Sequence, residues 1–293
     1  MRALLPWVLA VTLGLGGCGS KATSFSKATE APKLLGNASP AAHLPRSSTF
    51  VGHVDMVRFR KSSLFPAVVS FLRARGFGKF LIQQEKACGF SAFQGIDDVA
   101  FGNGPDGWTV VAHLATGEAE ALACVKKAFG GTEDGRSVRV DPYLVSARDG
   151  LLVAGDPRAV RGSMDASPDP AESDRLALKE STVALVRGDL GDITIDGRID
   201  ASPARVAALF GLRFASAEIA AAIYDRVTKA QSRALDGAER ALARDVLKSI
   251  KLSLRGSSVE VSLGTDGDLA IQERYLDVLL GILEIVLREY EGK

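Results

Sequence analysis

Three cysteines and three histidines carry the side chains best suited to chemistry in this chain. His53 and His113 lie within apolar runs that predict strands, whereas His43 lies in a proline-containing segment. His53 and His113 could be neighbours, but a catalytic dyad or metal pair needs further converging groups, so we favour structural roles. Asp97-Asp98 begins another predicted strand, and a solvated strand end explains this pair better than a carboxylate dyad.

The local motifs of common catalytic sites are not found in the sequence. There is no Gly-x-Ser-x-Gly turn, no HExxH zinc helix and no phosphate-binding loop with its lysine. The turn aspartates also lack the spacing of a calcium loop. We therefore predict no catalytic residues, no metal ligands and no cofactor, and we expect a protein that is not an enzyme.

Cys18 follows an apolar N-terminal run in which Arg2 is the only charge. Residues 4–16 form an apolar segment of about 13 residues, shorter than the ~20 that a membrane-spanning helix needs. The motif Leu15-Gly16-Gly17-Cys18 resembles the lipobox of bacterial lipoproteins. This resemblance implies cleavage before Cys18, diacylation of its sulfur and acylation of its new amine. The alternatives are an ordinary secretory leader with a chance cysteine, or a retained membrane helix.

Acylation at Cys18 would place the protein in the bacterial cell envelope, because two or three acyl chains anchor a protein stably whereas one does not. The next residues, Gly19 and Ser20, include no acidic residue. By resemblance to lipoprotein sorting rules, an outer-membrane protein facing the periplasm or the surface is expected if the source has two membranes. The membrane, through palmitate-type acyl chains, is thus the first expected partner.

The charge balance excludes some other partners. The chain has 36 basic and 35 acidic residues, so loss of Arg2 with the leader leaves equal numbers. A dedicated nucleic-acid binder would need a strong basic patch, and this composition predicts none. We therefore expect no nucleic acid, and envelope proteins are the remaining candidate partners.

Cys88 and Cys124 remain once Cys18 is used as an anchor. In an oxidising envelope two such cysteines suggest one disulfide. In the chain-entropy model, closing a loop of this length would stabilise the folded state by about 3–4 kcal/mol. Two buried free thiols are the alternative. Metal binding by the pair is disfavoured, because no CxxC motif or adjacent histidine pair completes a site.

The pattern of apolar residues, turns and linkers predicts an α+β protein with two related halves after a disordered tether. Each half is expected to hold an antiparallel or mixed sheet with packed helices. The expected segments are a leader at 1–17, the lipidated cysteine and flexible tether at 18–47, a first half at 48–165, a linker at 166–180 and a second half at 181–293. The tether would keep the body ~30 Å from the membrane.

Periodicity predicts the elements within each half. In the first half we expect a strand at 50–56, a helix at 62–76, an irregular segment at 78–95, a hairpin at 99–114, a helix at 118–129, strands at 138–145 and 151–154, and a short helix capped by Asp156. In the second half we expect strands at 182–186 and 193–199, a helix from 202 to about 211, helices at 216–235 and 236–248, a hairpin at 250–263 and a final helix at 266–290.

The two halves could be duplicates of one another, because the hairpin at 99–114 with its following helix resembles the hairpin at 249–263 followed by the helix at 266–290. Generic α+β packing is the alternative.

The final helix is apolar around most of its surface, which indicates a core helix, or else a wall of a ligand cavity or a partner-binding face. The sequence therefore predicts a lipid-anchored, non-catalytic binding or scaffolding module. A carrier or sensor of apolar ligands, with 216–235 and the final helix framing a cavity, is the alternative.

Overall fold

The computed structural model describes residues 39–89, 93–189, 191–236 and 241–266. It confirms the α+β class and places the described strands in antiparallel sheets. The chain forms two compact units. Of the described residues, the first unit comprises 39–60 together with those of 72–178, and the second comprises 61–71 together with those of 179–266.

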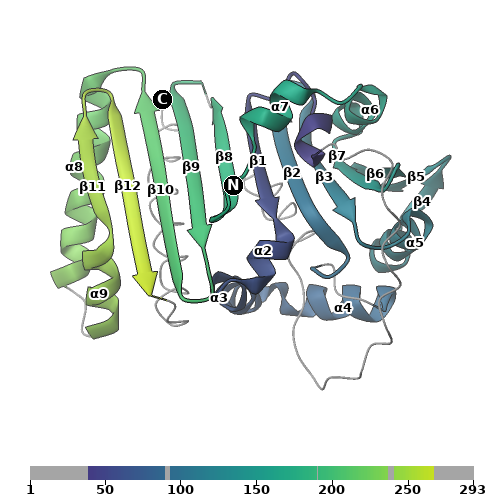
Figure 1. Cartoon of the computed structure of the whole chain (residues 1–293), viewed down its shortest axis with the longest axis horizontal. Helices are drawn as coiled ribbons and strands as arrows, with labels where there is room; N and C mark the ends of the chain where they lie inside the picture. Colours follow the sequence, from purple (N-terminus) through teal and green to yellow (C-terminus); the bar gives the residue numbers. More distant parts are fainter. Residues whose placement is uncertain (1–38, 90–92, 190, 237–240, 267–293) are drawn as a thin grey trace. The chain divides into compact units, whose positions relative to one another are not determined.

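The sheet of the first unit has the strand order β1-β2-β3-β7-β6-β5-β4, with each neighbouring pair antiparallel (Figure 1). Its strands are β1 (Phe50–Asp55), β2 (Ile96–Gly104), β3 (Gly107–Leu114), β4 (Thr132–Asp134), β5 (Ser137–Val140), β6 (Tyr143–Arg148) and β7 (Leu151–Gly155). Its helical segments are η1 (Pro40–His43), α2 (Met56–Lys61), η2 (Arg73–Phe77), α4 (Gly78–Cys88), α5 (Glu118–Phe129), α6 (Pro157–Asp165) and α7 (Pro170–Arg175).

Turn chemistry fixes the hairpins of this sheet. Asp149 and Gly150 both have positive φ between β6 and β7, as a two-residue hairpin turn requires. The predicted strand 138–145 is instead two strands, β5 and β6, separated at Asp141-Pro142. Proline has no N–H to donate to a ladder, so the chain turns there and Val138 pairs with Val145.

Helices cover both faces of the first sheet. On one face α5 packs Val125 against Val138, Val145 and Ala154. On the opposite face Leu44, just after η1, lies over Gly102 of β2. Because α6 and α7 also pack on that second face, the unit has a layer of helices on each side of the sheet.

Three segments of the first unit are more ordered than the sequence indicates. The expected irregular stretch after Gly78 begins with the helix α4, whose buried side chains are few and include Leu81 and Gln84. The expected linker contains α7, followed by the fully buried Leu176. The end of the expected tether forms η1, with Ala41 completely buried. Each segment is too short or too polar for its sequence to show a clear helical period of apolar residues.

The sheet of the second unit has the order β11-β12-β10-β9-β8 and is also antiparallel. Its strands are β8 (Thr182–Asp189), β9 (Ile193–Ala201), β10 (Arg205–Phe214), β11 (Lys251–Arg255) and β12 (Ser258–Asp266), and its helices are α3 (Leu64–Leu72), α8 (Ala217–Asp236) and α9 (Ala241–Ser249). Helix α8 packs on β10, β11 and β12, and the Ser216 hydroxyl accepts from the Ile219 N–H at its start.

The prediction of a helix that begins at residue 202 was wrong. Residues 205–214 form β10, in which Val206, Ala208, Leu212 and Phe214 are buried in a period of two. The alanines and leucines of this segment favour a helix locally, but pairing with β9 on one side and β12 on the other decides its conformation. The predicted final helix at 266–290, and residues 237–240 of the predicted capping sequence, lie outside the described residues.

The two units share a strand order. In each, three antiparallel strands are followed by a helix, and a returning hairpin places its last strand beside the third: β1-β2-β3-α5-β6-β7 and β8-β9-β10-α8-β11-β12. The hairpin β4–β5 is additional in the first unit. This order relates β2, β3 and α5 to β9, β10 and α8. The sequence had instead suggested that they correspond to 249–263 followed by 266–290. Duplication of the chain stays a prediction.

Candidate functional site

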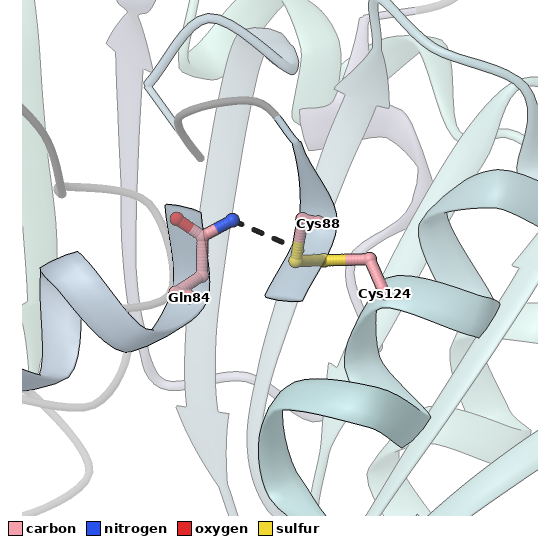
Figure 2. Close-up of a disulfide and its surroundings, with 3 residues drawn as sticks. All are labelled: Gln84, Cys88 and Cys124. Carbon is pink, nitrogen blue, oxygen red and sulfur yellow. Dashed lines mark hydrogen bonds between the residues drawn. A yellow bond between two sulfur atoms is a disulfide. The ribbon is translucent and has the colours of Figure 1, made fainter. Parts of the chain in front are cut away.

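The residues predicted to carry the lipid anchor, Leu15, Gly16, Gly17 and Cys18, lie outside the described residues. The other predicted site pair is present: Cys88 and Cys124 form a disulfide. It joins the last residue of α4 to the middle of α5, and the Gln84 Nε2 lies 3.9 Å from the Cys124 Sγ (Figure 2). The bridge therefore ties α4 to a helix that is itself packed on the sheet.

His53 of β1 is the most enclosed titratable side chain of the first sheet, with 6% of its surface exposed. Its Nε2 lies 2.7 Å from the Asp98 Oδ1 on β2. Its Nδ1 lies 2.7 Å from the backbone oxygen of Leu176, just after α7. The side chain therefore connects two strands of the sheet to the segment that covers them.

These two contacts favour the protonated form of His53. A carbonyl oxygen and an ionised carboxylate only accept hydrogen bonds, so the ring satisfies both contacts when each of its nitrogens carries a proton. Burial opposes this charge, but the hydrogen bond and charge of Asp98, the Leu176 oxygen and the charge of Asp55 outweigh it and raise the pKa of His53 above its ordinary value.

His113 and His43 lie on the same face. The strand register places Asp55 opposite Asp98 and Asp98 opposite His113, so these three residues form one row across β1, β2 and β3. His43 ends η1, which contacts β3. Burial lowers the pKa of His43, and the nearby His113 and Arg148 lower it further against an opposing effect of Asp149. All three histidines of the chain are therefore gathered on one face of one sheet.

The contacts of His53, Asp98 and Asp97 are made with other groups of the protein. Both nitrogens of His53 are committed to protein atoms, so neither is available to take a proton from a substrate. Asp98 is paired with His53, and its neighbour Asp97 accepts from Arg60. The two aspartates are thus divided between separate ion pairs, and neither pairing could be read from their adjacency in the sequence.

Arg60 and Leu176 are the residues of this region that the sequence analysis did not single out. Arg60 donates to the backbone oxygens of Phe93 and Ile96 as well as to Asp97, which fastens the end of α2 to the start of β2. Leu176 contributes a backbone oxygen, which no side-chain pattern marks. The proline-rich composition of the segment before it also concealed its burial.

The described part of the chain bears on metal binding and on membrane spanning. No group of three or more histidine, cysteine, aspartate or glutamate side chains in that part of the chain is placed to hold a metal ion. No helix within the same residues is long and apolar enough to cross a membrane.

The observed architecture belongs to the broad class of α+β proteins built from antiparallel sheets with packed helices. No protein-family model matches the chain, and no curated protein matches it. The chain is structurally similar to solved crystal forms of TP0453. Form III aligns with a TM-score of 0.49 and 7% identity over 80% of this chain and 97% of that one.

Crystal form IV of TP0453 aligns with a TM-score of 0.47 and 6% identity over 82% of this chain and 97% of that one. Form I aligns with a TM-score of 0.47 and 9% identity over 84% and 98% of the respective chains. At this level the likeness carries no argument about function, which must come from the residues of this chain.

Proposed function

We propose that the protein is a lipid-anchored component of the bacterial cell envelope, held by acyl chains on Cys18, whose body is a non-catalytic binding or scaffolding module. The observation that carries this proposal is the N-terminal run ending in Leu15-Gly16-Gly17-Cys18. Its Gly19-Ser20 continuation favours the outer membrane of a bacterium with two membranes.

The disulfide supports an envelope location. Disulfides persist in oxidising compartments and are rare in reducing ones. Cys88 and Cys124, the two cysteines that the anchor does not use, are bonded to each other. The pairing of these two residues and the assignment of Cys18 as the anchor therefore support one another.

The exposed apolar side chains of the described residues are scattered. In the described part of the chain the exposed large apolar side chains are Val57, Ile82 and Leu254, on α2, α4 and β11. They are single residues on different elements rather than one apolar patch of the kind that marks an apolar docking site. The commitment of both His53 nitrogens likewise supports a body without acid–base chemistry.

Replacing Cys18 by serine should abolish acylation and release the protein from membranes, because serine offers no sulfur for the lipid. The measurement is incorporation of labelled palmitate in cells, followed by separation of membrane and soluble fractions. A variant in which Cys88 and Cys124 are both serine is the matched control, and it should stay acylated. Continued labelling of the Cys18→Ser protein would refute the anchor.

Native mass spectrometry after gentle extraction tests the role of the body. A binding or scaffolding module should carry no lipid beyond the acyl chains on Cys18. Stoichiometric lipid bound in addition to those chains would contradict the module and favour a carrier of apolar ligands.

A further inference from the structure

Strand β11 lies at the outer edge of the second sheet. Among the strands that the structure describes, β12 is the one that pairs with it (Figure 1). The backbone N–H and C=O groups on the outer side of an edge strand are a template for pairing with another extended chain. This edge is therefore a place where the sheet can accept a further strand.

The register of the β11–β12 hairpin indicates which backbone groups face outward. Arg255 and Ser258 are opposite one another across a two-residue loop, so the hydrogen bond of the turn joins this pair. Hydrogen-bonded and non-hydrogen-bonded pairs alternate along an antiparallel ladder. The N–H and C=O groups of Leu252 and Leu254 are therefore expected to point away from β12.

The first unit shows how such an edge is completed. Strand β6 holds the place in its sheet that β11 holds in the second, because the hairpins β6–β7 and β11–β12 follow α5 and α8 respectively. The outer side of β6 is paired with β5. Val138 and Val140 of β5 pack with Val125 of α5, so this added strand widens the apolar layer beneath the helix.

The apolar row that reaches the edge of the second sheet is only partly covered. Leu252 and Leu254 lie opposite Val261 and Val259, which are 3% and 1% exposed. Leu254 itself is 38% exposed. Apolar side chains of a strand added beside β11 would cover it and extend the buried row, as β5 does in the first unit.

The other face of β11 carries positive charge. Lys251 and Arg255 are exposed there, on either side of Ser253, which is opposite Glu260 of β12. Opposite charges on neighbouring strands stabilise a sheet and like charges destabilise it. A strand with acidic residues beside these two cations is therefore favoured. A second copy of β11, paired antiparallel about Ser253, would place Lys251 beside Arg255 and is disfavoured.

We propose that β11 binds an extended segment of a partner protein in which acidic and apolar residues alternate, and that this segment becomes an added strand of the second sheet. Its apolar side chains would cover Leu254, and its acidic side chains would lie beside Lys251 and Arg255. This inference rests on the proposed function and deepens it, because it states the chemistry of the partner that the binding module recognises.

A synthetic peptide of about seven residues that alternates glutamate and valine tests the proposal on the full chain. Anisotropy of the dye-labelled peptide should show binding, and the peptide should slow hydrogen exchange at the Leu252 and Leu254 amides. A peptide with lysine in place of glutamate should bind about tenfold more weakly. Reversing both edge charges, with Lys251→Glu and Arg255→Glu together, should reverse this preference.

A backbone variant tests strand addition separately from charge. Leu254→Pro removes an N–H that faces outward, and proline is tolerated at such positions of edge strands. The variant should no longer bind the glutamate peptide. If this variant does not fold, the charge-reversed variant still decides the proposal, because it leaves the backbone unchanged.

Four results would overturn the inference: no binding of the glutamate peptide, equal binding of both peptides, an unchanged preference in the charge-reversed variant, or slow exchange at Leu252 and Leu254 in the free chain. The last would mean that another segment of this chain or a second copy already occupies the edge. Acyl labelling of Cys18 and the search for bound lipid are independent measurements. Failure of strand addition therefore leaves the anchor standing, and stoichiometric lipid would overturn the binding module without altering the peptide result.

Discussion

Replacing Asp98 by alanine is expected to lower the free energy of unfolding of the first unit by about 2 kcal/mol at pH 6. The substitution removes the carboxylate that lies 2.7 Å from His53 Nε2 and leaves a buried imidazole whose remaining hydrogen bond is with the Leu176 oxygen. A buried charge without its partner is strongly unfavourable. Asp98→Asn keeps an acceptor at this position and should lose less stability than Asp98→Ala.

The pH dependence distinguishes loss of this ion pair from a general packing defect. In the native protein the folded-state pKa of His53 is raised, so its contribution is complete below pH 6.5 and is lost as the pH rises through that raised value. Without Asp98, the two largest effects that raise this pKa are lost, while burial, which lowers it, remains. The stability that the native protein gains when the pH is lowered from 8.5 to 6 should therefore be smaller in Asp98→Ala.

Urea unfolding at pH 6 and pH 8.5, followed by tryptophan fluorescence, measures this effect. The chain has two tryptophans, and the proposed cleavage before Cys18 would remove Trp7. Trp108, which is 8% exposed on β3, then reports on the first unit. Asp97→Ala is the matched control, since its ion pair with Arg60 is more exposed and should contribute at most about 1 kcal/mol. Equal losses in the two variants would contradict the role of His53.

Removal of the Cys88–Cys124 disulfide is expected to lower the free energy of unfolding by about 3–4 kcal/mol. The bond closes the loop that contains β2 and β3, which are central strands of the first sheet. Helix α4 contacts α5 and η2, and Ile82 on α4 is 53% exposed. Without the bond, α4 should also lose its hydrogen-exchange protection before the sheet does.

The measurement compares urea unfolding of the native protein with and without reductant, using Trp108 fluorescence. The variant in which both cysteines are serine should match the reduced protein and should not respond to reductant. An unchanged midpoint on reduction, with the thiols shown by alkylation to be free, would mean that packing alone holds α4 against α5.

Local patterns in the sequence predicted much of the secondary structure. The strand at 50–56, the hairpin at 99–114 and the helices at 118–129 and 216–235 all correspond to observed elements. In these segments the apolar period, the turn residues and the helix ends agree with one another, so local preference and final structure coincide. The disulfide could also be predicted, because Cys88 and Cys124 are the two cysteines that remain beside the proposed anchor, Cys18.

Other elements depended on partners that are distant in the sequence. Segment 205–214 became a strand because β9 and β12 offered it hydrogen bonds on both sides, although its composition suits a helix. The short helix α7 lies in a segment whose prolines and charges predicted a linker. Its neighbour Leu176 is buried against the first unit, and no local period could show this.

The motif Leu15-Gly16-Gly17-Cys18, the balanced charge and the number of cysteines can be read from the sequence itself, because they depend on residue type and order. The tertiary structure decided the environment of the histidines. His53 meets Asp98 across 45 positions and Leu176 across 123 positions, and these contacts raise its pKa. His43, expected in the tether, lies instead near His113 at the entry to the body, because η1 folds onto the same sheet face. Protonation depends on such surroundings, which only the folded chain assembles.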